Sequence, residues 1–544
     1  MLFKSYQRKH FLIIDDFDNF IISLKQMLRR LGAEDIDSAR NGDEAIQMCI
    51  KKHYDVVFCD YNMGDSHKNG QQVLEELRYR RLLKNMDLFI MVSAEAGKDM
   101  VFGALEYQPD GYITKPITQS LLQNRLDKMI EQKVSTMDIE RAMDEEDFAK
   151  AITLTNTQLK IDPKNRAWLI RTLGRLYHLN GDYAHAKKVF QDVLKNRPVE
   201  WARMGLAKAL FMEGNVQEAS ALFDDIVKEN AQNLEAYDWL AKCQKQAGQT
   251  RQAQETLKAA VAVSPRAILR QLELAGLSKQ LNDLDAAAKA FKASVKLGDK
   301  SCYETPEMHL DYSKTLTDLA EANQGMSGVR YAQDAVNALE NVRRKYHNDN
   351  RVQLLSHLVE VRAQGQQNNT EASAKALKQA QKLFVAAEMD EKDADIVTEM
   401  AHTLFSLGQS NEAESLLHSY AARFPQNTRV QAQVAELLEE PVSLAQRMKA
   451  REFNRQGIQL YEQGKLEEAL AVFNQALAIT PKHSGLNLNF LQALLKLASQ
   501  SGGLGSHRQS ATDALDRMAK MNENHRQYKR YQHLLGRFQA LKSV

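Results

Sequence analysis

This sequence of 544 residues has few of the features that mark small secreted or membrane-spanning proteins. Its four cysteines lie far apart and form no CxxC pair, which argues against a disulfide framework and against a zinc site. It contains no run of about 18 apolar residues that could span a membrane. The first ten residues lead directly into the pattern of a buried strand, not into the apolar segment of a secretory signal. We therefore expect a cytoplasmic protein with reduced thiols.

The sequence also lacks a large net charge, because its 72 Lys and Arg nearly balance its 70 Asp and Glu and leave a net charge of +2. Such a balance gives no bulk attraction to nucleic acid, and we expect neither a nucleic-acid nor a membrane partner. Nine prolines and 25 glycines are few for this length, while helix-favouring residues dominate after about residue 130. Most of the chain should be helical, and its length predicts several domains or a repeat array.

Residues 9–130 alternate short apolar runs with amphipathic stretches of helix length. This alternation is typical of βαβ units around a parallel sheet. Strands are predicted at His10–Ile14, Asp35–Ala39, Val56–Cys59, Leu88–Val92 and Gly111–Thr114. Helices are predicted near Phe17–Leu31, Asp43–Lys51, Gln71–Arg80, Lys98–Leu105 and Gln119–Ile130. The expected fold class of this segment is α/β, with a doubly wound, five-stranded parallel sheet.

After a charged connector predicted at residues 131–146, the pattern is purely helical and repeats about every 34 residues. Gly181, Gly214 and Gly248 mark the period, and Gly408 and Gly464 return to the same register. An alanine follows five residues after each glycine position, at Ala186, Ala219, Ala253 and Ala287. Four residues after each alanine stands a large apolar residue, at Phe190, Phe223, Leu257 and Phe291. The pattern resembles tetratricopeptide repeats, which stack helix pairs. That resemblance implies an all-α superhelical solenoid.

Open parallel sheets place reactive groups at the carboxyl ends of their strands. In residues 9–130 these positions hold Asp15, Asp16, Asp60, Ser93, Lys115 and Pro116. Three carboxylates at one sheet edge repel one another and suit a hard divalent cation, with Mg²⁺ favoured by oxygen ligands. A lysine ammonium and a serine hydroxyl beside them offer donors to a phosphoryl group. These residues therefore indicate phosphoryl transfer onto a carboxylate.

On these residues, the segment 9–130 resembles the CheY-like receiver domain of bacterial two-component response regulators. The resemblance implies a flavodoxin-like fold and no enzymatic activity beyond the domain's own aspartyl phosphorylation and dephosphorylation. It implies that Asp60 is the phosphoacceptor and that Mg²⁺ is held by four protein groups, the side chains of Asp15, Asp16 and Asp60 and the backbone carbonyl of Asn62. It also implies roles for later residues: phosphoryl binding by Ser93 and Lys115, a switch aromatic at Tyr112, and a cis bond at Lys115–Pro116.

The sequence departs from that family directly after Asp60. The usual Met-Pro dipeptide is Met63-Gly64 here, and the following residues delay the expected glycine to Gly70. We count about two added residues, in a loop that borders the phosphorylation site and bears on kinase docking.

The patterns together predict six segments. They are residues 1–132 (receiver), 133–166 (connector and partial first repeat), 167–300 (repeats), 301–392 (divergent helical repeats), 393–483 (repeats) and 484–544 (C-terminal capping helices).

Receivers are input modules, so the repeats are the candidate output, and their stacked helices offer a groove for a peptide or partner helix. The predicted function is a response regulator without DNA-binding output. A sensor histidine kinase or another phosphodonor would phosphorylate Asp60 and so switch the protein binding of the repeats. The output would be an adaptor or scaffold, or an inhibitor of a kinase or of a second regulator. Two alternatives stay open: a nucleic-acid effector that uses the basic stretch Arg508–Lys542, and a static scaffold with a non-signalling receiver.

Two short motifs in the repeat region resemble sites of other classes. Ala401–Leu404 places His402 like a phosphotransfer histidine, and Glu468–Leu470 spells a signature of cyclic-di-GMP phosphodiesterases. We expect both to be structural, because His402 falls inside the first helix of a repeat and Ala469 occupies a packing position of another. An internal phosphate relay through His402 remains an alternative.

Overall fold

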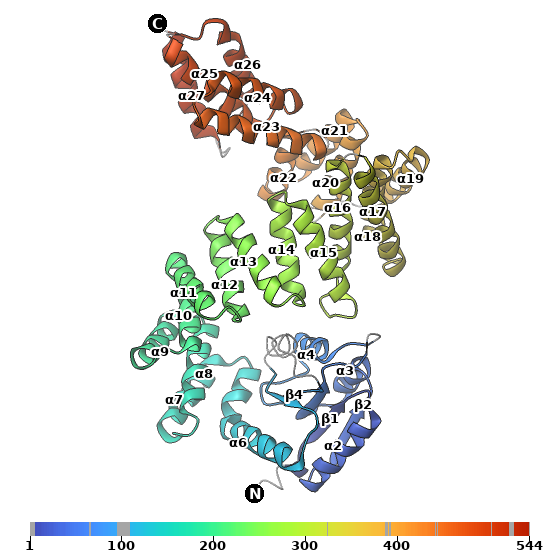
Figure 1. Cartoon of the computed structure of the whole chain (residues 1–544), viewed down its shortest axis with the longest axis vertical. Helices are drawn as coiled ribbons and strands as arrows, with labels where there is room; N and C mark the ends of the chain where they lie inside the picture. The colour runs from blue at the N-terminus through green and yellow to red at the C-terminus, as the bar shows by residue number, and fades with distance from the viewer. Residues whose placement is uncertain are drawn as a thin grey trace. The chain divides into compact units, whose positions relative to one another are not determined.

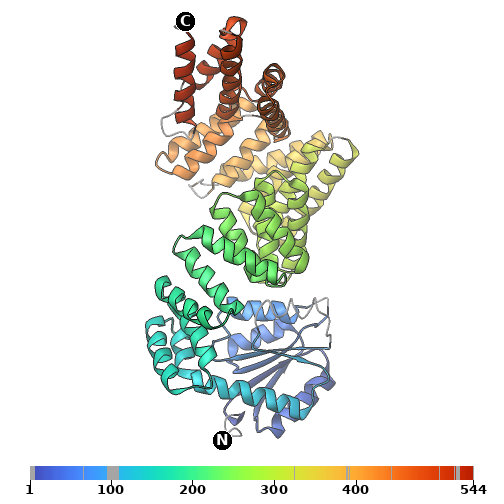
Figure 2. The same ribbon diagram turned by 60° about the vertical axis from the view of Figure 1, so that its left-hand side comes forward.

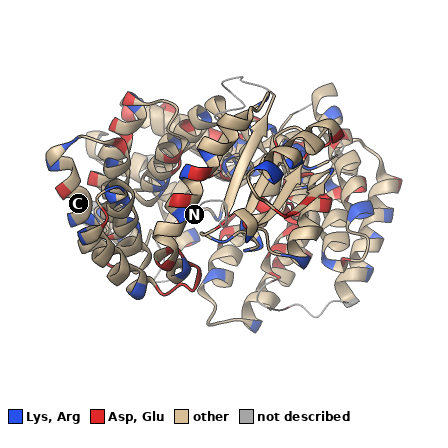
Figure 3. Cartoon of the chain, turned by 90° about the horizontal axis from the view of Figure 1, so that it is seen from below, with Lys and Arg blue, Asp and Glu red and all other residues tan. Residues whose placement is uncertain are grey.

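The computed structural model describes residues 6–64, 67–94, 109–323, 325–386, 390, 393–440, 442, 444–501, 503–519, 521 and 527–542. The chain, drawn in Figure 1, divides into two compact units, Met1–Met308 and His309–Val544. Lys and Arg are interspersed with Asp and Glu along the helices, as expected from the balanced composition (Figure 3). Every helix in the described ranges is too short or too polar to cross a membrane.

The first unit begins with a sheet of five parallel strands in the order β2-β1-β3-β4-β5. The strands are β1 (His10–Ile14), β2 (Asp35–Ala39), β3 (Val56–Asp60), β4 (Leu88–Ser93) and β5 (Gly111–Thr114). β3 and β4 are buried along their whole length, which explains why their sequences are apolar throughout. The α/β fold predicted for this segment is confirmed.

Helices cover both faces of the sheet. They are α2 (Asp18–Arg30), α3 (Gly42–Lys51), α4 (Gly70–Tyr79) and α6 (Gln119–Asp144). Figure 1 shows α2 and α6 on one side of the strands and α3 and α4 on the other. Along β1, Phe11 and Ile13 join the core under α2 and α6, whereas Leu12 and Ile14 join the other core, because successive strand side chains point to opposite faces. The helix expected near Lys98–Leu105 lies outside the described residues.

Residues 131–146 do not form the connector that we expected. α6 continues without a break to Asp144 (Figure 2). Its first half buries Leu122 and Leu126 against the sheet, and its second half contributes Ile139 and Ala142 to the core of the first helix pair. The helix continues because no proline or glycine interrupts residues 119–144 and apolar residues recur at helical spacing.

The rest of the first unit consists of helix pairs. Their helices are α7 (Phe148–Ile161), α8 (Arg166–Leu179), α9 (Tyr183–Asn196), α10 (Glu200–Met212), α11 (Val216–Glu229), α12 (Leu234–Gln246), α13 (Thr250–Val263), α14 (Ile268–Gln280) and α15 (Leu284–Gly298). The turn inside a pair needs a left-handed residue, and Gly181, Gly214 and Gly248 supply it with φ of 76°, 87° and 75°. Asn282 takes this position in the pair α14–α15, with φ of 58°.

Phe190 shows why small residues recur in these repeats. Its ring lies between α8 and α10, where Gly174 and Gly205 face it. A Cβ at either glycine would stand 2.4 Å from Phe190 Cζ. The two glycines therefore let the helices approach the buried Phe190 ring closely from both sides.

This packing predicts opposite effects for two glycine substitutions. Gly205→Ala should destabilise the first unit by about 1–3 kcal/mol, since the added methyl group overlaps the Phe190 ring. Gly276→Ala on α14 should stabilise it by about 0.5–1 kcal/mol, because the site is open and alanine favours a helix. Urea unfolding followed by circular dichroism measures both variants. Shifts of the same sign would contradict this account of the packing.

In the residues that the structure describes, the regular elements of the second unit are all helices. Its helices are α16 (Pro306–Ala322), which begins just before the boundary, α17 (Met326–Lys345), α18 (Asn350–Gln366), α19 (Thr370–Ala386), α20 (Ala394–Ser406), α21 (Ser410–Arg423), α22 (Thr428–Glu439), α23 (Leu444–Glu462), α24 (Leu466–Ile479), α25 (Ser484–Ser501), α26 (Arg508–Met518) and α27 (Tyr528–Lys542). α16–α19 have 17–20 residues and are longer than the 13–15 residues of α8–α15, which fits their loss of the repeat signature. At the C-terminal end, α25, α26 and α27 share one apolar core with α24.

Candidate functional site

The residues selected from the sequence lie at one edge of the sheet. Asp15 and Asp16 follow β1, Asp60 ends β3, Ser93 ends β4 and Lys115 follows β5. Parallel strands end at the same edge, so residues up to 100 positions apart in the chain become neighbours there. The backbone N–H of Lys115 donates to the carbonyl oxygen of Ser93 at 2.8 Å, which fixes the end of β5 beside β4.

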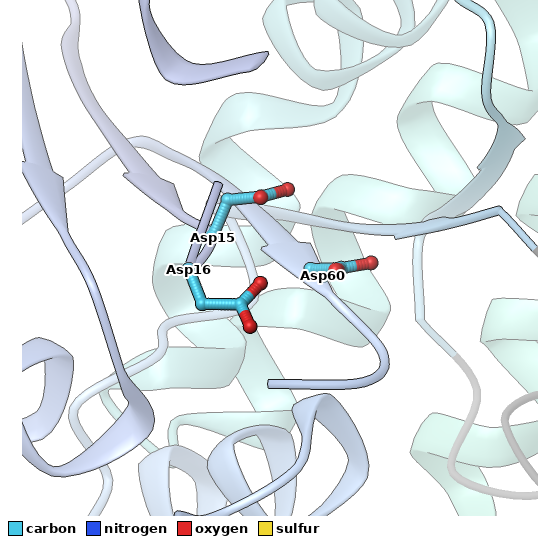
Figure 4. A group of neighbouring side chains, drawn as sticks. All are labelled: Asp15, Asp16 and Asp60. Atoms are coloured by element: carbon cyan, nitrogen blue, oxygen red, sulfur yellow. The ribbon is translucent and has the colours of Figure 1, made fainter. Parts of the chain in front are cut away.

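Three carboxylates form the centre of the site. Asp15, Asp16 and Asp60 each bring one carboxylate oxygen to within 4.8 Å of the others. Figure 4 shows the three side chains directed into the same space. Asp15 is fully buried and Asp60 nearly so, while Asp16 is exposed. A set of hard oxygen donors with an open side fits Mg²⁺, which prefers carboxylates and keeps several water ligands.

Lys115 partly neutralises this cluster. Its Nζ lies 2.7 Å from Asp15 Oδ2 and 3.2 Å from Asp60 Oδ2, and 4.2 Å from the centre of the Phe20 ring. One ammonium against three carboxylates leaves an excess of negative charge, which favours a divalent cation. The Lys115–Pro116 peptide bond is cis.

Burial changes the acidity of Asp60. Loss of solvent raises the pKa of its carboxyl group to about 6, with Lys115 lowering the pKa and Asp15 raising it. The charged form of Asp60 is therefore costly without further positive charge. A bound cation would favour the carboxylate, which is the form that can act as a nucleophile.

The segment after Asp60 is held close to it. Tyr61 N donates to Val92 O, and Gly70 N donates to Tyr61 O at 2.9 Å. A Cβ at Gly70 would lie 2.5 Å from the carbonyl oxygen of Asp60, so this position has no room for a side chain. The glycine that comes late in the sequence thus starts α4 directly against the peptide group of Asp60. Asn62, between them, is exposed.

Two of the expected residues, Ser93 and Tyr112, lie on β4 and β5. Ser93 is 4% exposed at the end of β4. Tyr112 on β5 is half-buried against the core under α3 and α4, and Arg125 donates to its carbonyl oxygen. Most of the segment that joins β4 to β5 lies outside the described residues.

Known proteins are similar to the N-terminal part of the chain. A family model described as "Response regulator receiver domain" matches residues 11–127. Chemotaxis protein CheY-3 of Vibrio cholerae is 34% identical over 121 residues, which make up 22% of this chain and 91% of that relative. The chain belongs to the response regulator receiver family. Chemotaxis protein CheY of Pseudomonas aeruginosa is 31% identical over 121 residues, 22% of this chain and 95% of the relative.

The helical part matches a second family. Models described as "Tetratricopeptide repeat" match residues 171–233, 210–272, 371–437 and 450–483. The predicted order, a receiver domain followed by these repeats, is confirmed. Among solved structures, the receiver domain of the Francisella response regulator 1452 is 24% identical and covers 23% of this chain and 98% of its own, with a TM-score of 0.21.

These families set the general function. Receivers bind Mg²⁺ in an acidic pocket and accept a phosphoryl group from a donor such as a histidine kinase, and the repeats imply protein partners. The chain is thus a response-regulator-like signalling protein with a protein-interaction domain, and neither family is catalytic in general.

The other sequence candidates are engaged in packing. His402 on α20 is half-buried, and its Nδ1 lies 2.6 Å from Arg447 Nη2. In the basic C-terminal stretch, Arg530 donates to Asn489 and Gln492, while α27 buries apolar side chains in the core that it shares with α25. Both observations favour a structural role for these residues.

Sequence reasoning missed a second contact between the receiver and the repeats of the first unit. Lys68 Nζ, from the loop with the added residues, donates to the carbonyl oxygen of Lys300 at 2.6 Å. Gln72 Nε2 on α4 approaches the carbonyl oxygens of Leu297 and Asp299 at 3.4 Å each. The signal that could have indicated this contact is the added length after Asp60, because an insertion beside a functional site often contacts another element.

Proposed function

We propose that this protein is a cytoplasmic two-component response regulator whose output is protein binding by its repeats. The observation that supports this proposal is the convergence of Asp15, Asp16, Asp60 and Lys115 at the carboxyl edge of the sheet. Beyond the receiver, tetratricopeptide repeat models match residues 171–272, 371–437 and 450–483, and such repeats suit binding rather than chemistry.

In this proposal Asp60 is the phosphoacceptor. A carboxylate oxygen of Asp60 attacks the phosphorus of the donor, an O–P bond forms, and the bond between phosphorus and the donor's leaving group breaks. Lys115 and Ser93 donate to the phosphoryl oxygens, and Tyr112 responds to the movement of Ser93 as the switch residue. Asp15, Asp16, Asp60 and the carbonyl group of Asn62 would hold Mg²⁺, which when bound neutralises charge on the transferred group.

Partner capture from native cytosol, with and without beryllofluoride and Mg²⁺, tests the proposal. We expect the amount of a partner retained by the wild type to change at least about fivefold on addition of beryllofluoride, while the Asp60→Ala variant shows no change. The identity of the partner then shows whether the output is an adaptor or an inhibitor of a kinase or second regulator. Equal retention under all four conditions would contradict the proposal and indicate a static scaffold.

A further inference from the structure

The receiver meets the repeats of its own unit at two places. At the first, the helix α6 runs from the receiver into the repeats. Near its end, Asp144 Oδ1 accepts from the backbone N–H and from the side chain of Asn85, at 2.8 and 2.7 Å. The other, the clamp contact, joins Lys68, Gln72 and Tyr79 of the receiver to residues 297–303, the end of α15 and the loop that follows. In it the Tyr79 and Tyr303 rings pack edge to face, with centroids 5.8 Å apart.

The clamp contact supplies donors to a helix end that needs them. The last carbonyl groups of an α-helix have no partner within the helix and carry partial negative charge. Gln72 Nε2 is directed at the carbonyl groups of Leu297, in the last turn of α15, and of its C-cap Asp299, and Lys68 Nζ donates to Lys300 just beyond the helix. The Lys68 side chain is only 12% exposed and also contacts Asp43 and Glu76, at 3.1 and 3.3 Å. It is therefore held in place and is not a solvated surface lysine.

The clamp contact also begins directly at the phosphorylation site. Gly70 N donates to Tyr61 O, and the missing Cβ of Gly70 leaves room for the carbonyl oxygen of Asp60. Two residues further on, Gln72 accepts from Asn69 N through Oε1 in the capping box of α4, so its Nε2 is free to turn toward α15. On the other side of the loop, Arg266 Nη1 lies 3.4 Å from Tyr61 Oη. The chain that follows Asp60 thus contacts the repeats both at Tyr61 and at Gln72.

A cavity of about 1080 Å³ lies between these contacts. Asn62, Gly64 and His67 of the receiver line one wall, and cationic side chains line the other, Arg266 from the loop before α14 and Lys289 and Lys296 from α15. The loop after Asp60 thus faces the repeats. A phosphoryl group on Asp60 adds up to two negative charges and three acceptor oxygens, which attract hydrogen-bond donors of the loop that directly follows Asp60. The same loop holds the contact with the repeats. Donation to the phosphoryl group and the contact with the repeats therefore compete, because one segment makes both.

We propose that the segment from Lys68 to Gln72 forms a clamp onto the end of α15 and the loop that follows it, and that phosphorylation of Asp60 opens it. This inference rests on the proposed function and names the contact through which its signal leaves the receiver. Opening uncovers the buried side of α4, including Glu75 and Glu76, together with the α15–α16 loop at residues 299–305. The surface that phosphorylation exposes therefore includes the α15–α16 loop, the junction that leads into the later helices.

Cys302 in this junction provides a native reporter. Its thiol is half-buried, and burial together with Glu75 and Glu76 of α4 raises its pKa to about 11. Opening the clamp returns solvent to the thiol and removes both carboxylates, so the reactive thiolate becomes more abundant. Peptide mapping after limited treatment with iodoacetamide at pH 8 separates Cys302 from the other cysteines, of which Cys59 and Cys243 are buried.

We expect alkylation of Cys302 in the full-length wild type to become about tenfold faster, or more, with beryllofluoride and Mg²⁺, since each pKa unit changes the thiolate fraction tenfold. The Asp60→Ala variant should remain slow in both conditions. Gln72→Glu keeps the oxygen that caps α4 but turns a second oxygen toward the carbonyl groups at the end of α15, which it repels. In this variant Cys302 should therefore be alkylated fast even without beryllofluoride. Lys68→Met, which keeps an unbranched apolar chain and removes the donor, should act in the same direction. Gln123→Glu, exposed on α6, is the matched control and should behave like the wild type.

An unchanged or slower reaction of wild-type Cys302, with bound beryllofluoride visible by ¹⁹F NMR, would overturn the clamp, as would slow reaction in both Gln72→Glu and Lys68→Met. If bound beryllofluoride changes partner retention but leaves Cys302 unchanged, the clamp fails and the proposed function stands. If the wild type gives no ¹⁹F signal of bound beryllofluoride, the proposed function itself fails.

Discussion

Replacing Asp60 with alanine should reduce phosphoryl incorporation from acetyl phosphate by about 10³-fold or more, to the background level. The expectation follows from the position of Asp60, whose carboxylate is near both Asp15 and the ammonium group of Lys115. Removal of the nucleophile leaves the neighbouring groups with no atom to which phosphorus could be transferred. Intact-mass spectrometry of acid-quenched samples measures the incorporated group, and removal of Mg²⁺ by EDTA should lower incorporation in the wild type as well.

Asp55 is the matched control for Asp60. It directly precedes β3, at the opposite edge of the sheet, where it accepts from the backbone N–H of His10 at 2.8 Å. Asp55→Asn should therefore keep incorporation within about twofold of the wild type, since the two edges are separated by the length of the strand. Labelling of Asp60→Ala at the wild-type rate would show that the acceptor is a different residue.

The second large effect concerns Arg362 on α18, whose guanidinium group is 4% exposed. It contacts Asp318 at 2.6 Å and Glu321 and Glu399 at 2.7 Å each, all three nearly buried. Arg362→Met should destabilise the second unit by about 3–5 kcal/mol, because it leaves three carboxylates in the interior with their main cation removed. Thermal and urea unfolding, read from the transition of the second unit, measure this loss.

Arg351, on the same helix, provides the comparison. It also pairs with two carboxylates, Asp393 and Asp395, but its side chain is 39% exposed. Arg351→Met should cost less than about 1 kcal/mol, as is usual for exposed ion pairs. If both substitutions lower stability equally, burial is not what makes the Arg362 cluster important.

The receiver could be predicted in detail because its signals are local. β1, β3 and β4 are short, largely apolar runs, and Asp15, Asp60 and Lys115 stand directly at strand ends, so the topology alone brings them together. The helical repeats were equally clear wherever Gly, Ala and Phe kept their register. Asn282 shows the limit of that signal, since it fills the place of the expected glycine by adopting the same left-handed conformation.

What the sequence could not predict depends on distant partners. Whether Arg362 is exposed or buried is decided by carboxylates on α16 and α20, more than 36 residues away in either direction. In the same way, the added length after Asp60 indicates an unusual loop but not the helix end that Lys68 and Gln72 contact. The continuation of α6 was missed for a different reason, because a charged, amphipathic stretch was interpreted as a linker although it has helical spacing and no helix breaker.

The hydrogen bond between Lys68 and Lys300 spans 232 residues, and this separation affects the order in which the first unit folds. The sheet and each helix pair are built mostly from contacts between neighbouring elements, whereas this bond closes a long loop. During synthesis the N-terminal α/β domain can fold before residue 300 has left the ribosome. In such a partly synthesised chain the aspartate pocket is complete while α4 is uncovered. The contact that the pocket would control forms only after residue 300 has been added.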